Sequence, residues 1–186
     1  MAYQWVIASC NQETILKKGE QLYLFFYFTS MKKLLLIRHA KATHDTGYID
    51  FERPLKKSGI QDATIMAQRL HAENIIPKLI ISSPALRTIA TADIFSQHLS
   101  VTAPLTNERI YDASELTLLH IIDQFPDEHE FIALVGHNPG IAEMLYYFTG
   151  KVKDVRPGAV ALISFDIDTW KEVSMNSGEL VYYDEP

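Results

Sequence analysis

The stretch Leu34-Leu35-Leu36-Ile37-Arg38-His39-Ala40 decides the fold of this chain. Its four aliphatic residues follow one another without alternation, which predicts a strand buried on both faces, as in a parallel sheet covered by helices. The run ends abruptly at a cation and an imidazole. Because ligands of open α/β sheets bind at the carboxyl ends of the strands, we expect Arg38 and His39 to stand at a functional edge.

The composition indicates a folded, acidic domain. The chain has 186 residues, of which 47% are hydrophobic, and this is enough for a sizeable core. The formal net charge is -6 and no block of Lys or Arg stands out, so we expect neither a nucleic-acid-binding nor a membrane-binding surface. Any anion that the protein binds must therefore be held by a few placed cations.

The single cysteine, Cys10, excludes an internal disulfide and indicates a reducing compartment, which we take to be the cytoplasm. Cys10 is not the nucleophile of a Cys-x5-Arg phosphatase, because Leu16 stands where the arginine is required.

Residues 1–30 look like an extension outside the main domain, which we expect to span residues 31–186. The apolar run at residues 22–28 is far shorter than the roughly 20 residues that span a bilayer. A signal peptide is disfavoured because a core strand follows the run directly. We expect residues 1–30 to be poorly ordered or to pack peripherally.

The main domain reads as repeated strand–loop–helix units. Ser58, with Gln61 three residues later, predicts a capped helix start, and Ser83 followed by Pro84 predicts another. The further elements predicted are buried strands at residues 79–81 and 131–135, a weak strand at 106–111, helices from Ser114 and over about 141–148, a hairpin or edge-strand pair at 159–167 and 171–175, and a turn at 177–179.

Three of these units place Arg38-His39, Arg87 and His137 after a strand, and parallel strands would bring them to one edge of the sheet. Guanidinium groups pair with phosphate oxygens in a bidentate way, and two helix N-termini would add N–H donors. A neutral imidazole is also a nucleophile toward phosphorus. The set therefore suits a phosphoryl group.

Four ordered motifs carry a resemblance to a known family. They are Leu36-Ile37-Arg38-His39-Ala40, Arg53-Pro54-Leu55 with Gly59, Ser82-Ser83-Pro84 with Arg87-Thr88, and Val135-Gly136-His137-Asn138-Pro139-Gly140. Together they resemble the histidine phosphatase superfamily, whose founding members are the phosphoglycerate mutases, and more closely its small SixA-type branch of phosphohistidine phosphatases. The resemblance implies a three-layer α/β/α sandwich, phosphoglycerate mutase-like, whose mostly parallel sheet has an antiparallel edge strand.

The resemblance also implies a mechanism. His39 would attack phosphorus in line and form a phosphohistidine intermediate, which water then hydrolyses. Arg38, Arg87 and His137 would hold the phosphoryl oxygens, and Asn138 and Arg53 would line the anion pocket in a lesser role. No metal and no cofactor are implied, and the other histidines form no pair at metal-ligand spacing.

The general acid is open at this point. Glu108 resembles the acidic position that protonates the leaving group in mutases, but Asp45 or Asp50 on the first loop could reach instead. Imidazole is a better leaving group than an alkoxide, so a phosphohistidine substrate lowers the demand for an acid. Ala40 stands where the family usually has glycine, which the SixA branch tolerates.

The short interval between Glu108 and His137 leaves no room for a long lid, so we expect an open site that admits a phosphorylated protein, such as a histidine-phosphotransfer domain. One alternative is a broad small-molecule phosphomonoesterase of the same superfamily. Another, from a different class, is a non-catalytic phosphate-binding module.

Overall fold

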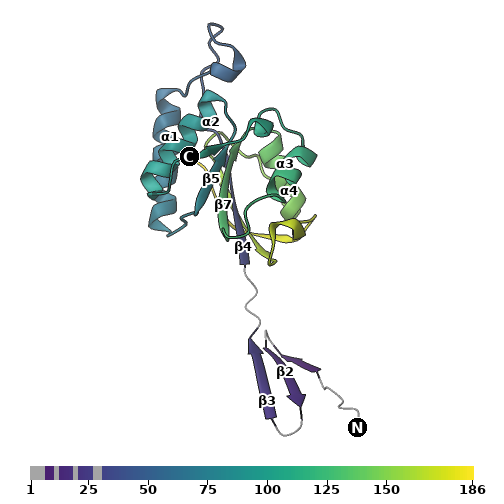
Figure 1. The fold of residues 1–186 in the computed structure, drawn as a ribbon. Helices are drawn as coiled ribbons and strands as arrows, with labels where there is room; N and C mark the ends of the chain where they lie inside the picture. The colour runs from purple at the N-terminus through teal and green to yellow at the C-terminus, as the bar shows by residue number, and fades with distance from the viewer. Residues whose placement is uncertain (1–6, 11–12, 19–20, 27–30) are drawn as a thin grey trace. The chain divides into compact units, whose positions relative to one another are not determined.

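The computed structural model describes residues 7–10, 13–18, 21–26 and 31–186, and the chain divides into two units, Met1–Ser30 and Met31–Pro186. In the first unit, β1 (Ile7–Cys10), β2 (Glu13–Lys18) and β3 (Gln21–Phe26) pair consecutively as an antiparallel sheet (Figure 1). The expectation about the order and packing of residues 1–30 falls partly outside the described residues and stays a prediction.

The second unit is built on a six-stranded sheet with the order β6-β5-β7-β4-β8-β9. Its strands are β4 (Met31–Arg38), β5 (Leu79–Ser82), β6 (Leu105–Thr106), β7 (Phe131–Gly136), β8 (Val160–Asp166) and β9 (Gly178–Asp184). Strands β6, β5, β7 and β4 run parallel to one another, and β8 is antiparallel to both of its neighbours. The expected antiparallel strand, β8, is therefore not the edge strand, because β9 pairs with its outer side.

The quoted stretch forms the buried centre of this sheet. Alternate residues of β4 face opposite sides, so that Leu34 and Leu36 enter one hydrophobic core and Leu35 and Ile37 enter the other. All four are 0% exposed. The prediction of a strand buried on both faces is confirmed.

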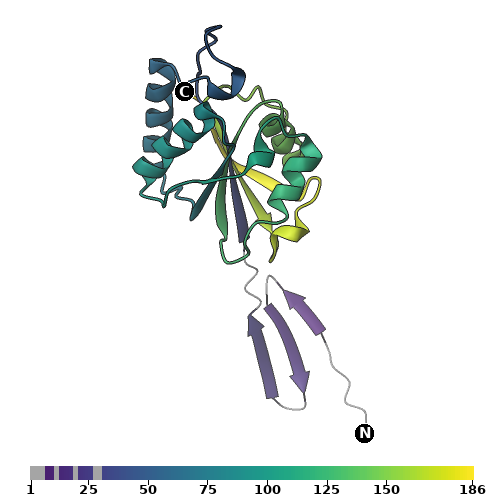
Figure 2. The same ribbon diagram turned by 45° about the horizontal axis from the view of Figure 1, so that its top comes forward.

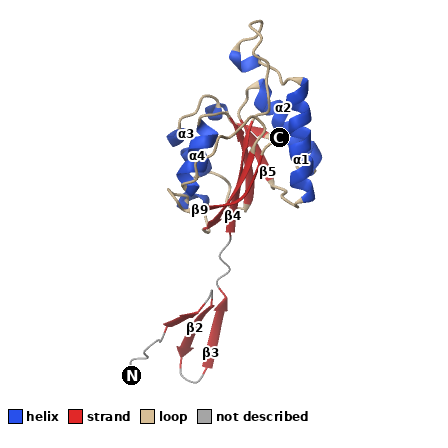
Figure 3. Cartoon of the chain, turned by 180° about the vertical axis from the view of Figure 1, so that it is seen from behind, coloured by secondary structure: helices blue, strands red, loops and turns tan. Residues whose placement is uncertain are grey.

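Helices cover both faces of the sheet. Residues of α1 (Lys57–Ala72) and α2 (Leu86–Leu99) pack into the core that contains Leu35 and Ile37. Residues of α3 (Glu115–Ile122) and α4 (Gly140–Thr149) pack into the opposite core. Figures 2 and 3 show the resulting three layers, with helices on both sides of the twisted sheet.

Two predicted helix starts are wrong. α1 begins at Lys57, and its N-cap Lys56 makes no side-chain cap, so Ser58 and Gln61 form no capping box. α2 begins at Leu86 after the N-cap Ala85, rather than at Pro84. The hydroxyl of Ser83 instead accepts a hydrogen bond from Ala85 N and lies against His137. The prediction that Ser114 caps α3 is confirmed by its bond from Thr117 N.

The chain after β8 also differs from the prediction. Residues 171–175 form no strand. Trp170 is fully buried and begins the short 3-10 helix η3 (Trp170–Glu172), and a capping box between Thr169 and Glu172 caps the start of this helix. Of the predicted turn at residues 177–179, Gly178 and Glu179 are instead the first two residues of β9. Within the described residues, no helix is long and apolar enough to cross a membrane.

Candidate active site

The backbone of His39 is held from both sides of β4, by strand β7 and by the turn that precedes β8. On the β7 side, His39 N donates to Gly136 O at 3.0 Å. On the other side, Gly158 N donates to the carbonyls of Arg38 and His39, at 3.2 and 3.1 Å. Gly158 has φ +90°, a conformation that favours glycine, so this residue suits its position. The sheet therefore fixes the backbone that carries the imidazole.

The side chain of His39 is arranged as a neutral nucleophile. Its Nδ1 lies 2.9 Å from Ala40 O. A carbonyl only accepts, so Nδ1 carries the hydrogen and Nε2 keeps its lone pair. Burial lowers the pKa of His39 to about 4, and the charges of Arg87, Arg38 and Arg53 add to this effect while the bond to Ala40 opposes it. The ring is therefore unprotonated at neutral pH.

Arg87 and His137 form the buried wall of the site. Arg87 stands in the first turn of α2, after the end of β5, and its side chain is only 6% exposed. His137 follows β7, and its ring centroid lies 5.2 Å from that of His39. Burial, and next the charge of Arg87, lower the pKa of His137 to about 3. Ser83 Oγ lies 2.8 Å from its Nε2.

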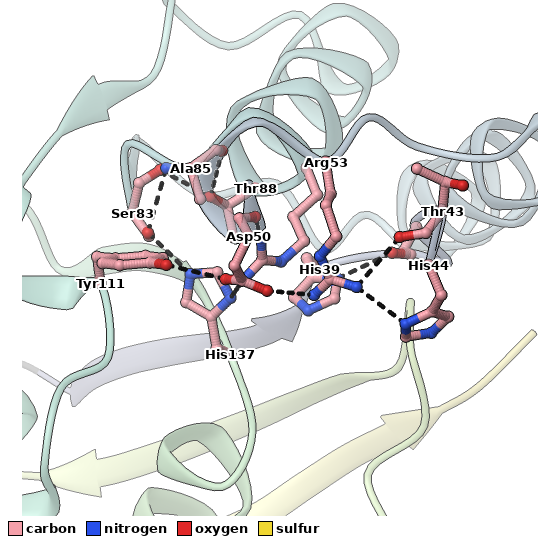
Figure 4. A network of polar contacts seen from close by, with 12 residues as sticks. His39, Thr43, His44, Asp50, Arg53, Ser83, Ala85, Thr88, Tyr111 and His137 are labelled. Carbon is pink, nitrogen blue, oxygen red and sulfur yellow. Dashed lines mark hydrogen bonds and ion pairs between the residues drawn. The ribbon is translucent and has the colours of Figure 1, made fainter. Parts of the chain in front are cut away.

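Asp50 brings a carboxylate into this group of cations, from the 3-10 helix η1 (Asp50–Glu52). Its Oδ2 accepts from Arg87 Nη2 and from Tyr111 Oη, both at 2.9 Å, and its Oδ1 pairs with Arg53 Nη2 at 2.7 Å. Figure 4 shows Asp50 between Tyr111, His137 and Arg53. Although burial alone would raise it, the bonds from Tyr111 and Arg87 and the two guanidinium charges lower the pKa of Asp50 to about 2.

Arg38 and Asn138 share one backbone acceptor on a third side. Arg38 Nη1 and Asn138 Nδ2 donate to Val155 O at 2.8 and 3.0 Å. Burial lowers the pKa of Arg38, and nearby Asp154 opposes this. The Oδ1 of Asn138 and the Nε atoms of Arg38 and Arg87 are buried without a hydrogen-bond partner among the described residues. These donor and acceptor atoms are therefore available to a ligand in the site.

These residues line one cavity of about 590 Å³. It brings together the following residues expected from the sequence: Arg38, His39, Arg53, Arg87, His137 and Asn138. Of the candidate acids, Asp50 lines the cavity, whereas Glu108 is exposed on η2 (Glu108–Ile110) and Asp45 is exposed on the loop, and neither lines it. The cavity also contains Asp112, so its charge is mixed but predominantly positive.

Tyr111 and Ser83 are two contacts of this site that sequence reasoning did not assign. Tyr111 follows η2 and reaches Asp50 across 61 positions of chain. No local pattern signals such a contact. The sequence pattern predicts a helix cap at Ser83, and only its position four residues before Arg87 points toward the cavity. Among the described residues, no group of three or more His, Cys, Asp or Glu could hold a metal ion.

The arrangement can bind an oxyanion between guanidiniums and present Nε2 of His39 to it. Solved structures share the fold. A protein of Agrobacterium tumefaciens named as a phosphohistidine phosphatase, SixA, is 24% identical, with a TM-score of 0.73 over 83% of this chain and 98% of that one. A SixA complexed with tungstate is 17% identical, with a TM-score of 0.72 over 83% of this chain and 97% of that one. The phosphoglycerate mutase-like fold class is therefore confirmed.

The sequence comparison gives the family. The model of the histidine phosphatase superfamily, branch 1, matches residues 34–130, and the chain belongs to this superfamily. An uncharacterised protein of Mycobacterium tuberculosis is 26% identical over 160 residues, 70% of this chain and 99% of that protein. An uncharacterised chloroplastic protein of Arabidopsis thaliana is 28% identical over 159 residues, 79% of this chain and 72% of that protein. Membership supports a phosphatase, and hence a hydrolase.

Proposed function

We propose that this protein hydrolyses phosphohistidine on a protein substrate, through a phosphohistidine intermediate on His39. One observation carries the proposal: the Nδ1 of His39 is anchored on Ala40 O, at 2.9 Å, in a cavity lined by Arg38 and Arg87. The anchored tautomer leaves Nε2 as a nucleophile, and the guanidiniums supply the charge that a phosphoryl group needs.

In the first step, Nε2 of His39 attacks phosphorus and the leaving group departs on the opposite side. The Nδ1 hydrogen bond to Ala40 O stabilises the positive charge that the ring of His39 gains. Arg38 and Arg87 stabilise the equatorial oxygens. In the second step, water attacks the same phosphorus and releases phosphate, and His39 returns to its neutral form.

The family and the fold support this class of substrate. The most similar folds include two proteins named as phosphohistidine phosphatases. The exposed position of Glu108, outside the cavity, fits a leaving group that needs no strong acid. A broad phosphomonoesterase of the same superfamily is the alternative. A cytoplasmic location, a phosphoprotein partner and independence of metal ions stay predictions.

The test is phosphate release from a histidine-phosphorylated transfer domain and from a panel of phosphomonoesters, with chelator present. We expect the phosphoprotein to have the highest kcat/KM, and His39→Ala to be inactive. His98→Ala, at an exposed histidine of α2, is the matched control and should retain wild-type activity. Rapid quenching should trap a phosphoryl group that is stable in alkali and labile in acid on the wild type and on His98→Ala, but not on His39→Ala. Faster turnover of esters than of the phosphoprotein would establish the alternative instead.

A further inference from the structure

Two carboxylates line the cavity, Asp50 and Asp112, and the hydrogen bonds around Asp50 keep it ionised. Asp50 accepts from Arg87 Nη2, Arg53 Nη2 and Tyr111 Oη at 2.7 to 2.9 Å. Three donors on two oxygens stabilise the ionised form, which has no hydrogen to give. A group so placed cannot serve as the acid that protonates an alkoxide.

Exposure places Asp50 on the outer side of the site. Its side chain is 54% exposed, whereas that of Arg87 is 6% exposed, so the guanidinium lies at the floor and the carboxylate at the mouth. A leaving group that belongs to another protein must extend toward solvent. In-line displacement puts it opposite the attacking nitrogen of His39. Asp50 and Tyr111 line the same cavity as His39, so a leaving group that reaches solvent at the mouth lies beside the carboxylate of Asp50.

Arg53 keeps Asp50 in this position when a phosphoryl group enters. Arg87 can turn its donors to phosphoryl oxygens, but Arg53 lies on the same turn as Asp50, three residues later. Arg53 is itself anchored, since its Nη1 donates to Thr43 O at 3.1 Å and lies 3.0 Å from His44 Nδ1 (Figure 4). The Asp50–Arg53 pair therefore needs no contact with Arg87 to persist.

Resting on the proposed function, we propose that Asp50 is the residue that selects the leaving group. It favours a phosphorylated imidazole that carries its own proton, and it disfavours alkyl phosphate esters. The substrate imidazole is protonated on the nitrogen that does not bear phosphorus, and the carboxylate attracts this cation. An ester oxygen gains negative charge as it leaves, and the same carboxylate repels it.

The transfer step balances without an external proton. The P–N bond of the protonated phosphoimidazole breaks, its electron pair stays on the ring nitrogen, and the ring leaves as neutral imidazole. The new bond joins phosphorus to Nε2 of His39, whose ring becomes the cation. An alkyl ester would leave as an alkoxide, which Asp50 cannot protonate.

The experiment compares kcat/KM for N-phosphohistidine and for O-phosphoserine in wild type and Asp50→Asn. This constant reports the transfer to His39 and leaves out hydrolysis of the common phosphoenzyme. Removing the charge should lower the ratio of the two constants, phosphohistidine over phosphoserine, by at least about tenfold. Asp50→Ser, a smaller neutral replacement, should shift the ratio in the same direction.

Two control variants retain the negative charge at position 50. Asp50→Glu should keep the ratio within about threefold of wild type, and so should Asp45→Asn, which changes an exposed carboxylate of the same loop outside the cavity. An unchanged ratio in Asp50→Asn would show that Asp50 only positions the arginines, and an equal rise for both substrates would show that it only competes with phosphate. Either result overturns the proposal. The proposed function fails separately, if wild type does not turn over phosphohistidine or if His39→Ala does.

Discussion

Nη2 of Arg87 lies 3.2 Å from Nδ1 of His137, and this contact fixes which nitrogen of the imidazole bears hydrogen. Because a guanidinium only donates, Nδ1 of His137 is the acceptor. Its Nε2 therefore carries the proton, which it donates to Ser83 Oγ at 2.8 Å. The arginine thus orients the second histidine of the site in addition to lining the cavity for the phosphoryl group.

The first prediction concerns the guanidinium group of Arg87. Arg87→Lys keeps the charge but removes the paired N–H groups that reach Asp50 and His137. We expect kcat/KM to fall by at least about 100-fold, since both phosphate binding and the orientation of His137 are lost. Arg69→Lys, at an outer ion pair with Asp184, should stay within about twofold. A loss of less than about threefold in Arg87→Lys would contradict this role.

Neighbouring serines allow a matched test of the His137 contact. Ser83→Ala removes the acceptor for Nε2 of His137, so kcat/KM should fall by about tenfold. Ser82→Ala removes an equally buried hydroxyl that donates to Ser83 O. Both variants should lose similar stability in urea, but only Ser83→Ala should lose activity. Equal activity losses would assign the effect to packing instead of to His137.

The depressed pKa of His39 makes a prediction about pH. Burial moves its pKa from 6.5 to about 4, so the folded protein should bind this proton only near or below pH 4. The unfolded chain binds it near pH 6.5, and the free energy of unfolding should therefore fall as pH drops from 6.5 to 4. NMR titration of ¹⁵N-labelled histidines, with His39→Ala for assignment, measures the value directly. A midpoint near 6.5 would refute the neutral-nucleophile argument.

The start of α1 is set by a close approach of backbone to backbone. A Cβ at Gly59 would clash with the carbonyl oxygen of Lys41, which cannot rotate away as a side chain could. Gly59→Ala should therefore lower the free energy of unfolding by about 1–3 kcal/mol, measured in urea. At Gly47 the nearest atom is a side-chain oxygen of Asp45 at 3.6 Å, so Gly47→Ala should change it by less than about 0.5 kcal/mol. Similar values for the two variants would contradict the clash.

The central strand and the edge where its cations stand were predictable, because aliphatic runs report burial on both faces of a sheet. Residues 34–37 and 131–135 are strands whose ends meet as expected. No local sequence pattern predicts the order of the strands in the sheet. Sequence patterns do not predict β9, because none of its residues is buried and because it begins with Gly178, a residue typical of a turn.

The errors at helix starts have a common physical cause. Ser58 and Ser83 are good capping residues in isolation, but tertiary contacts decided both positions. Lys56, the N-cap of α1, donates its N–H to Lys41 O at 2.9 Å, and the hydroxyl of Ser83 lies 2.8 Å from Nε2 of His137. The sequence indicates only an acid at Asp50, because the three donors that keep it ionised come from residues 53, 87 and 111.

The backbone hydrogen bonds at His39 do not involve the loop that carries Asp50. Gly136 and Gly158 hold the nucleophile's main chain from two neighbouring segments of the domain. The carboxylate at the mouth comes instead from residues 43–55, a surface loop with its own internal bonds between Arg53 and Thr43. Substitutions in this loop can therefore change which phosphorylated group is accepted without moving Nε2 of His39. Related chains with the same sheet are expected to differ in substrate through this loop.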